Sequence, residues 1–422
     1  MKKTISTLLS ALLIAGGTVG LAACGDGSTG GTGGGGGGGG GAYNYNITVW
    51  VGEDTKPLTE SLIIKFNNEN TYGIHFNANV NEVTEGKAAG DVISKPGSAP
   101  EMFCFAQDQL ARLVEINMLA SPSNSVVRRI KDVHSDRAVN AVTMGETVYA
   151  YPLTEDNGYF LYYDKSVISE TQADSIEDII AQCEANNKYF SFGLEGAWYV
   201  ASFFYGAGAK SEWTVNDQGK FTAYDDTFNS PEGMIAAKGM QKVLKSNRYI
   251  KNGLASDFNG ATPAAAVISG IWDYSTAKNA LKENLGIAKL PTFTVDGNTY
   301  RLKSYLGCKM LGVTPQTDPT KASALAYLAE YLTGEDAQMQ RFTQFGWGPS
   351  VKTAQEKDEV KNNDVLTILK QTATIAQGQY PANWWAKPEA MSNSIKVATS
   401  DTAIQSALSK YSSELPGLLN AN

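Results

Sequence analysis

The 422-residue sequence is poor in the residues that hold metals and disulfides, with only two histidines and four cysteines. The two histidines lie far apart in the chain, so a metal site with several histidine ligands is not expected. Beyond Cys24, the cysteines at 104, 183 and 308 are odd in number and form no CxxC pair, which argues against a disulfide framework or a zinc site. Cys104 and Cys308 stand in apolar segments, so we expect buried free thiols. We expect neither a metal nor a cofactor.

The sequence also lacks the motifs of several enzyme classes. It contains no GxSxG, HExxH or GxxxxGK[ST], which removes several hydrolases and the P-loop nucleotide-binding proteins. The net charge of −8 argues against nucleic acid as a partner, which would call for basic stripes. No apolar run beyond the first residues is long enough to cross a bilayer, which takes about 20 residues.

The first 24 residues, MKKTISTLLSALLIAGGTVGLAAC, have the three parts of a bacterial export signal. Two lysines form the positive end, residues 8–15 the apolar middle and residues 21–23 the small-residue cleavage region. The segment LAAC resembles the lipobox, in which the cysteine is acylated and becomes the first mature residue. We therefore expect a signal peptide over 1–23 and a lipid anchor on Cys24. An ordinary secretory signal followed by a chance cysteine is the alternative.

A glycine-rich run follows the cysteine. Glycine loses the most backbone entropy on ordering, so we expect residues 24–46 to be a lipidated cysteine and a flexible tether. The chain that remains is longer than one hydrophobic core usually supports, so two lobes are expected. The protein is then a globular body held at the outer face of a bacterial membrane.

Apolar periodicity predicts alternating strands and helices after the tether. Segment 46–51 alternates like a strand, 58–66 carries apolar residues on one helical face, and 74–80 alternates again. Such a βαβ unit implies a sheet that is at least partly parallel, and an α/β fold. Further strands are predicted at 101–106, 147–153, 159–164, 265–271, 285–291 and 309–315. Further helices are predicted at 174–186, 231–246, 321–333, 335–344, 363–377 and 401–413.

A family resemblance begins at the segment SAPEMFCFAQDQLARLVEINMLASP. It resembles the strand, loop and helix of the maltose-binding-like sugar receptors of ATP-binding-cassette (ABC) importers. Other segments follow in the order of that family: ITVWVGEDTKPLTESLIIKFNNEN, VYAYPLTEDNGYFLYYDKSVI, AWYVASFFYGAGA, AAAVISGIWDYSTA, GIAKLPTF, YLGCKMLGVTPQT and FGWGPS. No single motif is specific, but the ordered set covers essentially the whole mature chain.

The resemblance implies a periplasmic-binding-protein-like fold with a ligand cleft between two discontinuous lobes. One lobe takes 47–154 and 305–350, the other takes 155–304 and 351–422, and the chain crosses between them three times. In that family the ligand closes the lobes, and the closed form is presented to a membrane permease. The implied protein is a monomeric, lipid-anchored receptor that delivers an oligosaccharide, maltodextrin-like or related, to an ABC importer. It is not an enzyme.

A sugar has flat C–H faces and a rim of hydroxyls, so its site needs aromatic planes and carboxylates or amides. Asp108 follows a predicted strand, where open α/β sheets bind ligands, and the family places a carboxylate there. A helix N-cap is the alternative role. Gln109 stands where the family often has arginine. The resemblance also assigns Phe105 to an aromatic wall and Asp54 to the polar cleft, with a buried strand residue and a loop cap as the alternatives.

In the second lobe, Glu195 precedes Trp198 and Tyr199 at a spacing that resembles an acid and a stacking aromatic of the family. Glu195 has an alternative role, because an acid at the start of a helix complements the helix dipole.

Trp272 matches a stacking tryptophan of the family, with a core position as the alternative. Adjacent side chains on a helix diverge by about 100°, so one of Trp384 and Trp385 is expected in the cleft and the other in the core. Asn157, at a hinge crossing, is expected at the rim of the sugar.

Two other functions stay open. The protein is a receptor for a non-sugar solute such as a peptide, polyamine or anion, or a lipid-anchored glycoside hydrolase with two carboxylates. Aromatic and acidic residues in a cleft suit a sugar receptor and a hydrolase equally, and the ordered resemblance favours the receptor. An anion receptor would favour arginine, and Arg112 is the one arginine near the expected contacts. The sequence names neither the sugar nor the permease.

Overall fold

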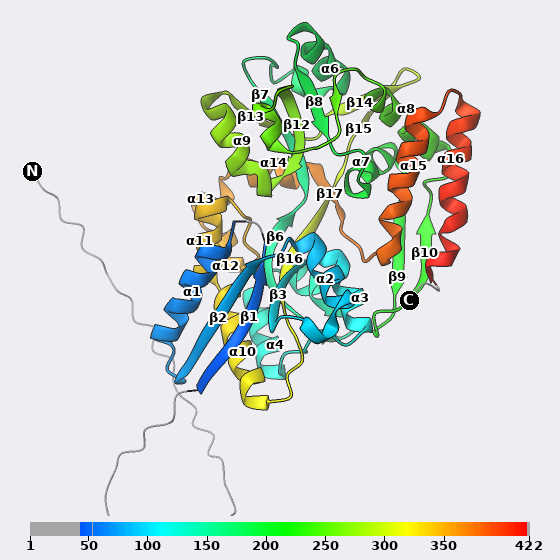
Figure 1. Cartoon of the computed structure of the whole chain (residues 1–422). Helices are drawn as coiled ribbons and strands as arrows, with labels where there is room; N and C mark the ends of the chain where they lie inside the picture. The colour runs from blue at the N-terminus through cyan, green and yellow to red at the C-terminus, as the bar shows by residue number, and fades with distance from the viewer. Residues whose placement is uncertain (1–42, 53, 420–422) are drawn as a thin grey trace, which may run out of the picture. The chain divides into compact units, whose positions relative to one another are not determined.

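The computed structural model describes residues 43–52 and 54–419 (Figure 1). The predicted export signal, Cys24 and most of the predicted tether lie outside these residues. The tether was predicted to continue through 46, and this is wrong: strand β1 (Tyr43–Val51) already includes Tyr43, which pairs with Ile74 of β2 (Ile74–Glu82). The tyrosines alternate with asparagines here, which extends the period-two pattern of the strand towards the N-terminus.

The first sheet contains β1, β2, β3 (Met102–Ala106), β6 (Tyr151–Asn157), β16 (Ser304–Val313) and β17 (Ala373–Ala376). Its strand order is β17-β16-β3-β1-β2, and β6 also pairs with β16. Strand β1 runs parallel to both of its neighbours, as the βαβ pattern predicted, whereas β16 is antiparallel to β3. Strands β3 and β16 are buried along their whole length, as expected for strands covered on both faces.

Helices that follow the strands of the first sheet cover it or lie at its ends (Figure 1). Buried leucines, isoleucine and phenylalanine of α1 face β2, as their spacing predicted. The helices and short strands of this part are α1 (Lys56–Glu69), α2 (Glu85–Ser94), α3 (Leu110–Glu115), α4 (Asn124–Val133), α5 (Asp136–Ala141), β4 (Thr143–Met144), β5 (Thr147–Val148), α10 (Pro319–Thr333), α11 (Glu335–Phe345), α12 (Lys352–Gln355) and α13 (Asp358–Lys361).

The second sheet has the order β11-β8-β12-β7-β13 and is mixed, because β12 is parallel to β8 and antiparallel to β7. Its strands are β7 (Tyr159–Asp164), β8 (Tyr189–Phe192), β11 (Tyr249–Ile250), β12 (Ala264–Gly270) and β13 (Leu285–Ala288). Around it lie α6 (Ile176–Ala185), α7 (Ala197–Ala207), α8 (Pro231–Leu244), α9 (Tyr274–Leu281), β14 (Thr292–Val295), β15 (Asn298–Arg301), α14 (Asp364–Thr372), α15 (Ala386–Val397) and α16 (Asp401–Glu414).

The chain passes from the first sheet to the second within one residue, Gly158, between β6 and β7. A Cβ at Gly158 would lie 2.3 Å from the backbone oxygen of Tyr305, at the start of β16. Two crossings therefore lie against each other, and only glycine allows that approach. A further crossing is tied to β6, because Gly348 accepts a hydrogen bond from the Glu155 amide (2.9 Å) and donates one to Asp156 Oδ2 (2.6 Å).

A hairpin of β9 (Ser211–Val215) and β10 (Phe221–Asp226) reaches from the second part of the chain to α3. Its Phe221 is buried in the core cluster of the first sheet. At its tip, Gly219 has φ of +81°, and a Cβ there would lie 2.2 Å from the backbone oxygen of Ala111. The hairpin therefore makes a second contact between the two halves, away from the crossings.

The predicted helix over 363–377 is wrong in its second half. Helix α14 ends at Thr372, and Ala373–Ala376 form β17, which pairs in parallel with β16. The four residues of β17, with the sequence ATIA, are too few to separate a strand from a helix end by period alone. The pairing also places β17 in the first sheet, although 351–422 were assigned to the other lobe.

Two smaller predictions are settled by the structure. Cys104, Cys183 and Cys308 are buried free thiols, as predicted for Cys104 and Cys308. Burial raises the pKa of Cys104 and of Cys183 to about 12, so both are inert thiols. Among the described residues, no helix is long and apolar enough to cross a membrane.

Candidate ligand-binding site

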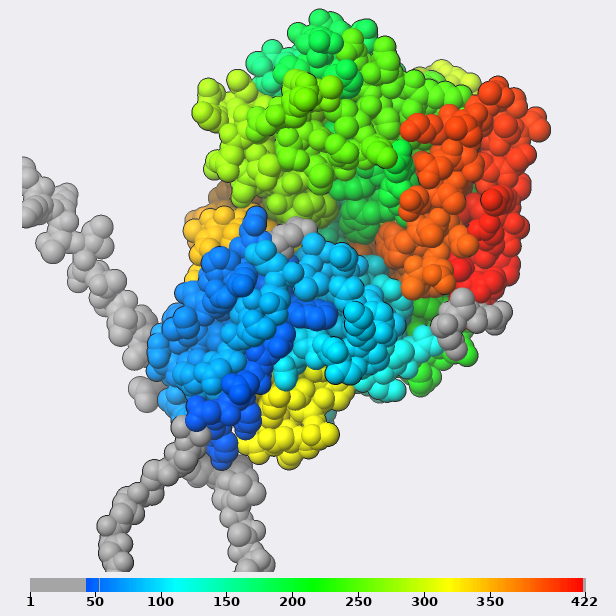
Figure 2. Space-filling view, in the orientation of Figure 1, coloured from blue at the N-terminus to red at the C-terminus, as the bar shows by residue number. Residues whose placement is uncertain are grey.

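A cavity of about 720 Å³ lies between the elements of the two sheets. In Figure 2 the surface is indented between the cyan segments, which include α2 and α3, and the green segments above them. The volume is in the range of pockets for small organic ligands. It is lined by Thr84, Glu85, Gly86, Lys87, Gly90, Asp91, Ala106, Asp108, Gln109, Arg112, Asn157, Trp198, Trp272, Lys309, Gln377, Ala382 and Trp385.

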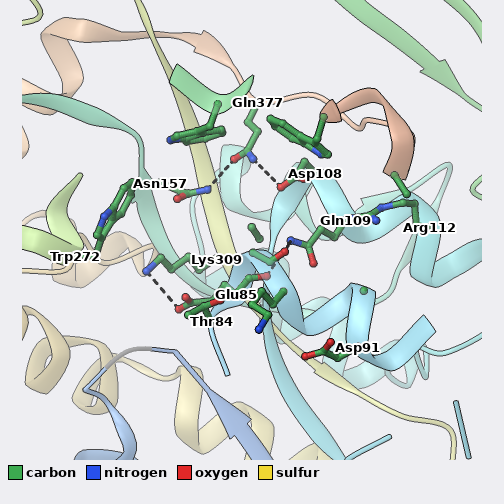
Figure 3. A pocket seen from close by; sticks show the side chains of 17 residues that line it. Thr84, Glu85, Asp91, Asp108, Gln109, Arg112, Asn157, Trp272, Lys309 and Gln377 are labelled. Carbon is green, nitrogen blue, oxygen red and sulfur yellow. Dashed lines mark hydrogen bonds and ion pairs between the residues drawn. The ribbon is translucent and has the colours of Figure 1, made fainter. Parts of the chain in front are cut away.

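The two walls of the cavity differ in chemistry (Figure 3). Every charged lining residue comes from the first-sheet side, on α2, α3, β16 or the turn after β3. All three lining tryptophans come from the other side: Trp198 on α7, Trp272 after β12 and Trp385 before α15. A ligand between these walls meets flat aromatic faces on one side and hydrogen-bonding groups on the other.

A chain of side-chain hydrogen bonds crosses the back of the cavity (Figure 3). Asn157 donates to Gln377 Oε1 (3.0 Å), and Gln377 Nε2 donates to Asp108 Oδ1 (2.9 Å). The three residues come from β6, from the segment after β17 and from the turn after β3. Asp108 is thus held by an amide that also contacts the crossing strand. The remaining oxygen of its carboxyl group is available for a ligand hydroxyl.

Burial raises the pKa of Asp108 to about 6, and the nearby Arg112 guanidinium opposes that rise. The side chain is 5% exposed, so the charged form loses most of its hydration. Asp108 therefore changes charge within two pH units of neutrality.

Gln109 borders the cavity, but its side-chain amide is committed to backbone groups. Its Nε2 donates to the backbone oxygens of Glu85 (2.9 Å) and Gly86 (3.1 Å), and its Oε1 accepts from the Ala89 amide (3.1 Å). These bonds fix the start of α2 against the turn after β3. Gln109 was predicted as a ligand contact; it borders the cavity, and its side-chain amide positions α2.

Lys309 and Glu85 form a buried ion pair on the floor of the cavity (Figure 3). The Lys309 Nζ lies 3.3 Å from Glu85 Oε1, and both side chains are about one-twentieth exposed or less. The ammonium also lies 3.8 Å from the ring centre of Trp347 and 5.9 Å from that of Trp272. The cation–π contact with Trp272 connects the charged wall to an aromatic residue of the opposite wall.

The other two tryptophans rest on a buried aromatic layer. Trp198 stacks on Tyr305 at 4.8 Å between ring centres, with 19° between the planes. Trp385 lies 5.0 Å from Trp384, and Trp384 is fully buried against Tyr380 and donates to the Tyr411 hydroxyl (3.2 Å). The adjacent tryptophans thus diverge as expected, with Trp385 at the cavity and Trp384 in the core.

Four further predicted contacts do not line the cavity. Phe105 is fully buried in β3 and packs on Phe103, which is the alternative role considered for it. Asp54 is exposed in a turn with φ of +55°. Tyr199 packs on Tyr159 at 4.9 Å between ring centres, behind the cavity wall. Glu195 pairs with lysines.

The two lysines that hold Glu195 are Lys251 at 2.9 Å and Lys396 at 3.4 Å. The hydrogen bond from Lys251 lowers the pKa of Glu195. The Glu195 carboxylate therefore forms ion pairs with two lysines and does not line the cavity, although Glu195 is close to Trp198 in the sequence.

Sequence reasoning missed Glu85, Lys309 and Gln377 as cavity residues. Lys309 had a signal, because it is the only charged residue in the otherwise apolar run YLGCKMLGV. A lysine in a fully buried strand requires a partner, and in the fold that partner is Glu85, more than two hundred residues away. Gln377 was hidden by its assignment to the end of a helix.

Comparisons with known proteins identify the family of the chain. Residues 62–367 match the family described as bacterial extracellular solute-binding protein, and this segment is more than half of the chain. The chain therefore belongs to the bacterial extracellular solute-binding proteins. Binding proteins make up this family, which confirms the prediction of a binding protein rather than an enzyme. The search of curated proteins gave no match.

Solved structures show the same fold. The maltodextrin-binding protein MalE1 of L. casei BL23 is 20% identical with a TM-score of 0.73, over 90% of this chain and 100% of that one. The GacH receptor of Streptomyces glaucescens is 17% identical with a TM-score of 0.73, over 90% and 99%. The maltose-maltodextrin-binding protein of Alicyclobacillus acidocaldarius is 16% identical with a TM-score of 0.72, over 88% and 100%. The predicted two-lobed fold class is thereby confirmed.

Proposed function

We propose that the protein binds an oligosaccharide in the cavity between its two sheets and delivers it to an ABC importer. The observation that carries this proposal is the pairing of three tryptophans on one wall with carboxylate, amide and guanidinium groups on the other. Tryptophan faces bind the C–H faces of a sugar, and the opposite groups bind its hydroxyls. The solved relatives named as maltodextrin-binding proteins support the choice of a sugar.

We assign fewer residues to sugar contacts than the sequence suggested. Trp198, Trp272 and Trp385 supply stacking, and Asp108 and Asn157 supply hydrogen bonds at the rim. The lobes that close on the ligand are 47–154 with 305–350, and 155–304 with 351–422, with β17 added to the first.

A titration of the full-length protein, purified in a detergent without a sugar headgroup, tests the proposal. Calorimetry and tryptophan fluorescence are recorded against malto-, xylo-, fructo- and galacto-oligosaccharides, and chromatography then checks that each sugar is intact. We expect micromolar binding of one class, quenched fluorescence and unaltered sugar. Silence across the panel would point to a non-sugar solute, and shortened sugar would point to a hydrolase.

We also propose that Cys24 carries a lipid that holds the protein at the outer face of the cell membrane. The support is the export signal and the LAAC segment. Mass spectrometry of the N-terminal peptide from membranes should show residue 24 as the first residue, bearing acyl chains, and Cys24→Ser should release the protein to the medium. A membrane-bound Cys24→Ser protein cut at the same site would contradict the anchor.

A further inference from the structure

Arg112 is a largely buried cation on the polar wall that the protein itself leaves without a hydrogen-bond partner. It lies on α3 between the buried core residues Ala111 and Leu113, and its side chain lines the cavity (Figure 3). Its Nε is buried and makes no hydrogen bond, and among residues 43–52 and 54–419 no side chain or backbone oxygen accepts from its guanidinium.

Other arginines of the chain have hydrogen-bond acceptors within the protein. Arg341, in the core, donates to the Leu332 backbone oxygen at 2.7 Å. Arg129, on the surface, makes two bonds to the Glu330 carboxylate at 2.6 and 2.8 Å. Buried polar groups are almost always bonded, so a guanidinium whose buried Nε has no partner beside a cavity requires an explanation.

Asp108 does not supply the missing bond. Its carboxylate attracts Arg112 through space, while burial lowers the pKa of Arg112. Gln377 donates to Asp108 Oδ1, and no hydrogen bond or ion pair joins Asp108 to Arg112. The two groups therefore stand side by side on one wall, one able to accept hydrogen bonds and the other able only to donate them.

We propose that Arg112 is a specificity-determining residue, whose guanidinium donates hydrogen bonds to oxygen atoms of the bound saccharide. This inference rests on the proposed function. It assigns to Arg112 the hydrogen-bond donor that the family resemblance led us to expect at residue 109. Gln109 cannot serve, because its amide is committed to α2. A guanidinium presents donors in a planar fork, so it suits two neighbouring oxygens of one sugar ring.

Three matched variants of the full-length protein test this role: Arg112→Met, Gln109→Met and Arg129→Met. For each, calorimetry gives the Kd for the saccharide that the wild type binds, and thermal unfolding without ligand gives Tm. Arg112→Met should weaken binding at least tenfold and leave Tm unchanged or higher, because an unpaired, partly desolvated cation is removed. Arg112→Lys should restore part of the affinity, since it returns the charge without the fork.

The other two variants separate binding from folding. Gln109→Met should lower Tm, because it removes bonds that hold α2, and Arg129→Met should leave Kd unchanged. An Arg112→Met protein that binds as tightly as the wild type would overturn the inference while the proposed function stands. A Tm loss like that of Gln109→Met would overturn it as well.

Failure of the proposed function gives a different pattern, in which the wild type binds no saccharide. In that case the Tm of Arg112→Met, compared with that of the wild type, tests whether the protein leaves Arg112 unpaired for a ligand. An Arg112→Met protein that melts at or above the wild-type temperature supports an unpaired cation kept for another solute. A lower Tm assigns Arg112 to the fold and overturns it.

Discussion

At the scale of single residues, the adjacent tryptophans 384 and 385 have different roles: we expect Trp385 to contribute to binding and Trp384 to stability. Trp385→Ala should weaken saccharide binding by about 1.5–3 kcal/mol, or roughly tenfold to a hundredfold, because it removes one stacking face. Trp384→Ala should instead destabilise the fold by about 3–5 kcal/mol, because its ring is fully buried. Calorimetry and urea unfolding of both variants check this, and an exchange of the two effects would contradict the site.

Asp108 makes stability depend on pH. Burial raises its pKa from 3.8 to about 6, so the folded protein holds this proton more tightly than the unfolded chain. Stability contributed by the neutral form is present below about pH 4 and is lost as pH rises to about 6. Asp108→Asn has no such loss. Between about pH 4 and pH 6, its free energy of unfolding should therefore rise relative to that of the wild type by at most about 3 kcal/mol.

Urea unfolding of wild type and Asp108→Asn at pH 4 and pH 7 measures the gain. His134 changes charge in the same range, since burial lowers its pKa to about 4, but it is present in both proteins and cancels in the difference. A difference in unfolding free energy that does not change with pH would show that Asp108 is solvated like a surface carboxylate.

Single residues also show what the sequence predicts and what it does not. Asp108 was predicted because a position after a strand marks the cavity edge of an α/β sheet, and Trp272 because it matches a stacking tryptophan of the family; both line the cavity. Gln109 and Glu195 have the right residue types beside the right neighbours, but backbone groups and lysines occupy them. Such competition between partners is decided by three-dimensional contacts, which no residue pattern contains.

At the scale of elements, the Glu85–Lys309 pair joins α2 to β16 inside the cavity. Lys309→Met should cost about 3–5 kcal/mol of stability, because it leaves a buried carboxylate without its cation. Adding Glu85→Gln should restore part of that loss. Urea unfolding of the two single variants and the double variant measures the coupling, and strictly additive losses would show that the pair contributes nothing.

The contact between the β9–β10 hairpin and α3 has a matched test in two glycines. Gly219 and Gly297 both have φ of +81°, but only at Gly219 would a Cβ meet backbone, at 2.2 Å from the Ala111 oxygen. Gly297→Ala should lower stability by about 1 kcal/mol or somewhat more, because it introduces strain at a positive φ without a steric clash. Gly219→Ala should destabilise further, and equal melting temperatures would mean that the hairpin does not press on α3.

Strands and helices with long, regular patterns were predicted well. Strand β7 occupies 159–164 as predicted, and α10 and α11 lie within two residues of their predicted bounds. The error at 363–377 has a physical cause, because β17 is a strand only through its pairing with β16. Its four residues carry too little pattern to oppose the helix that precedes them.

At the scale of the whole molecule, one chain builds two chemically different walls by crossing between two sheets. The crossings bring Asn157, Lys309 and Gln377 to the cavity, and each comes from a different segment of the chain. The ordered family resemblance predicted the two-lobed fold class and placed Asn157 at a crossing, but it did not indicate Lys309 or Gln377. Their place depends on strand register at the junction, which is set by tertiary pairing.

The most direct test of the account is a crystal structure of the protein with the saccharide that the titration identifies. The account predicts a sugar between the two walls, with ring faces on Trp272 or Trp385 and hydroxyls within hydrogen-bond distance of Asp108. A sugar bound at any other surface, with this cavity left to solvent, would contradict it.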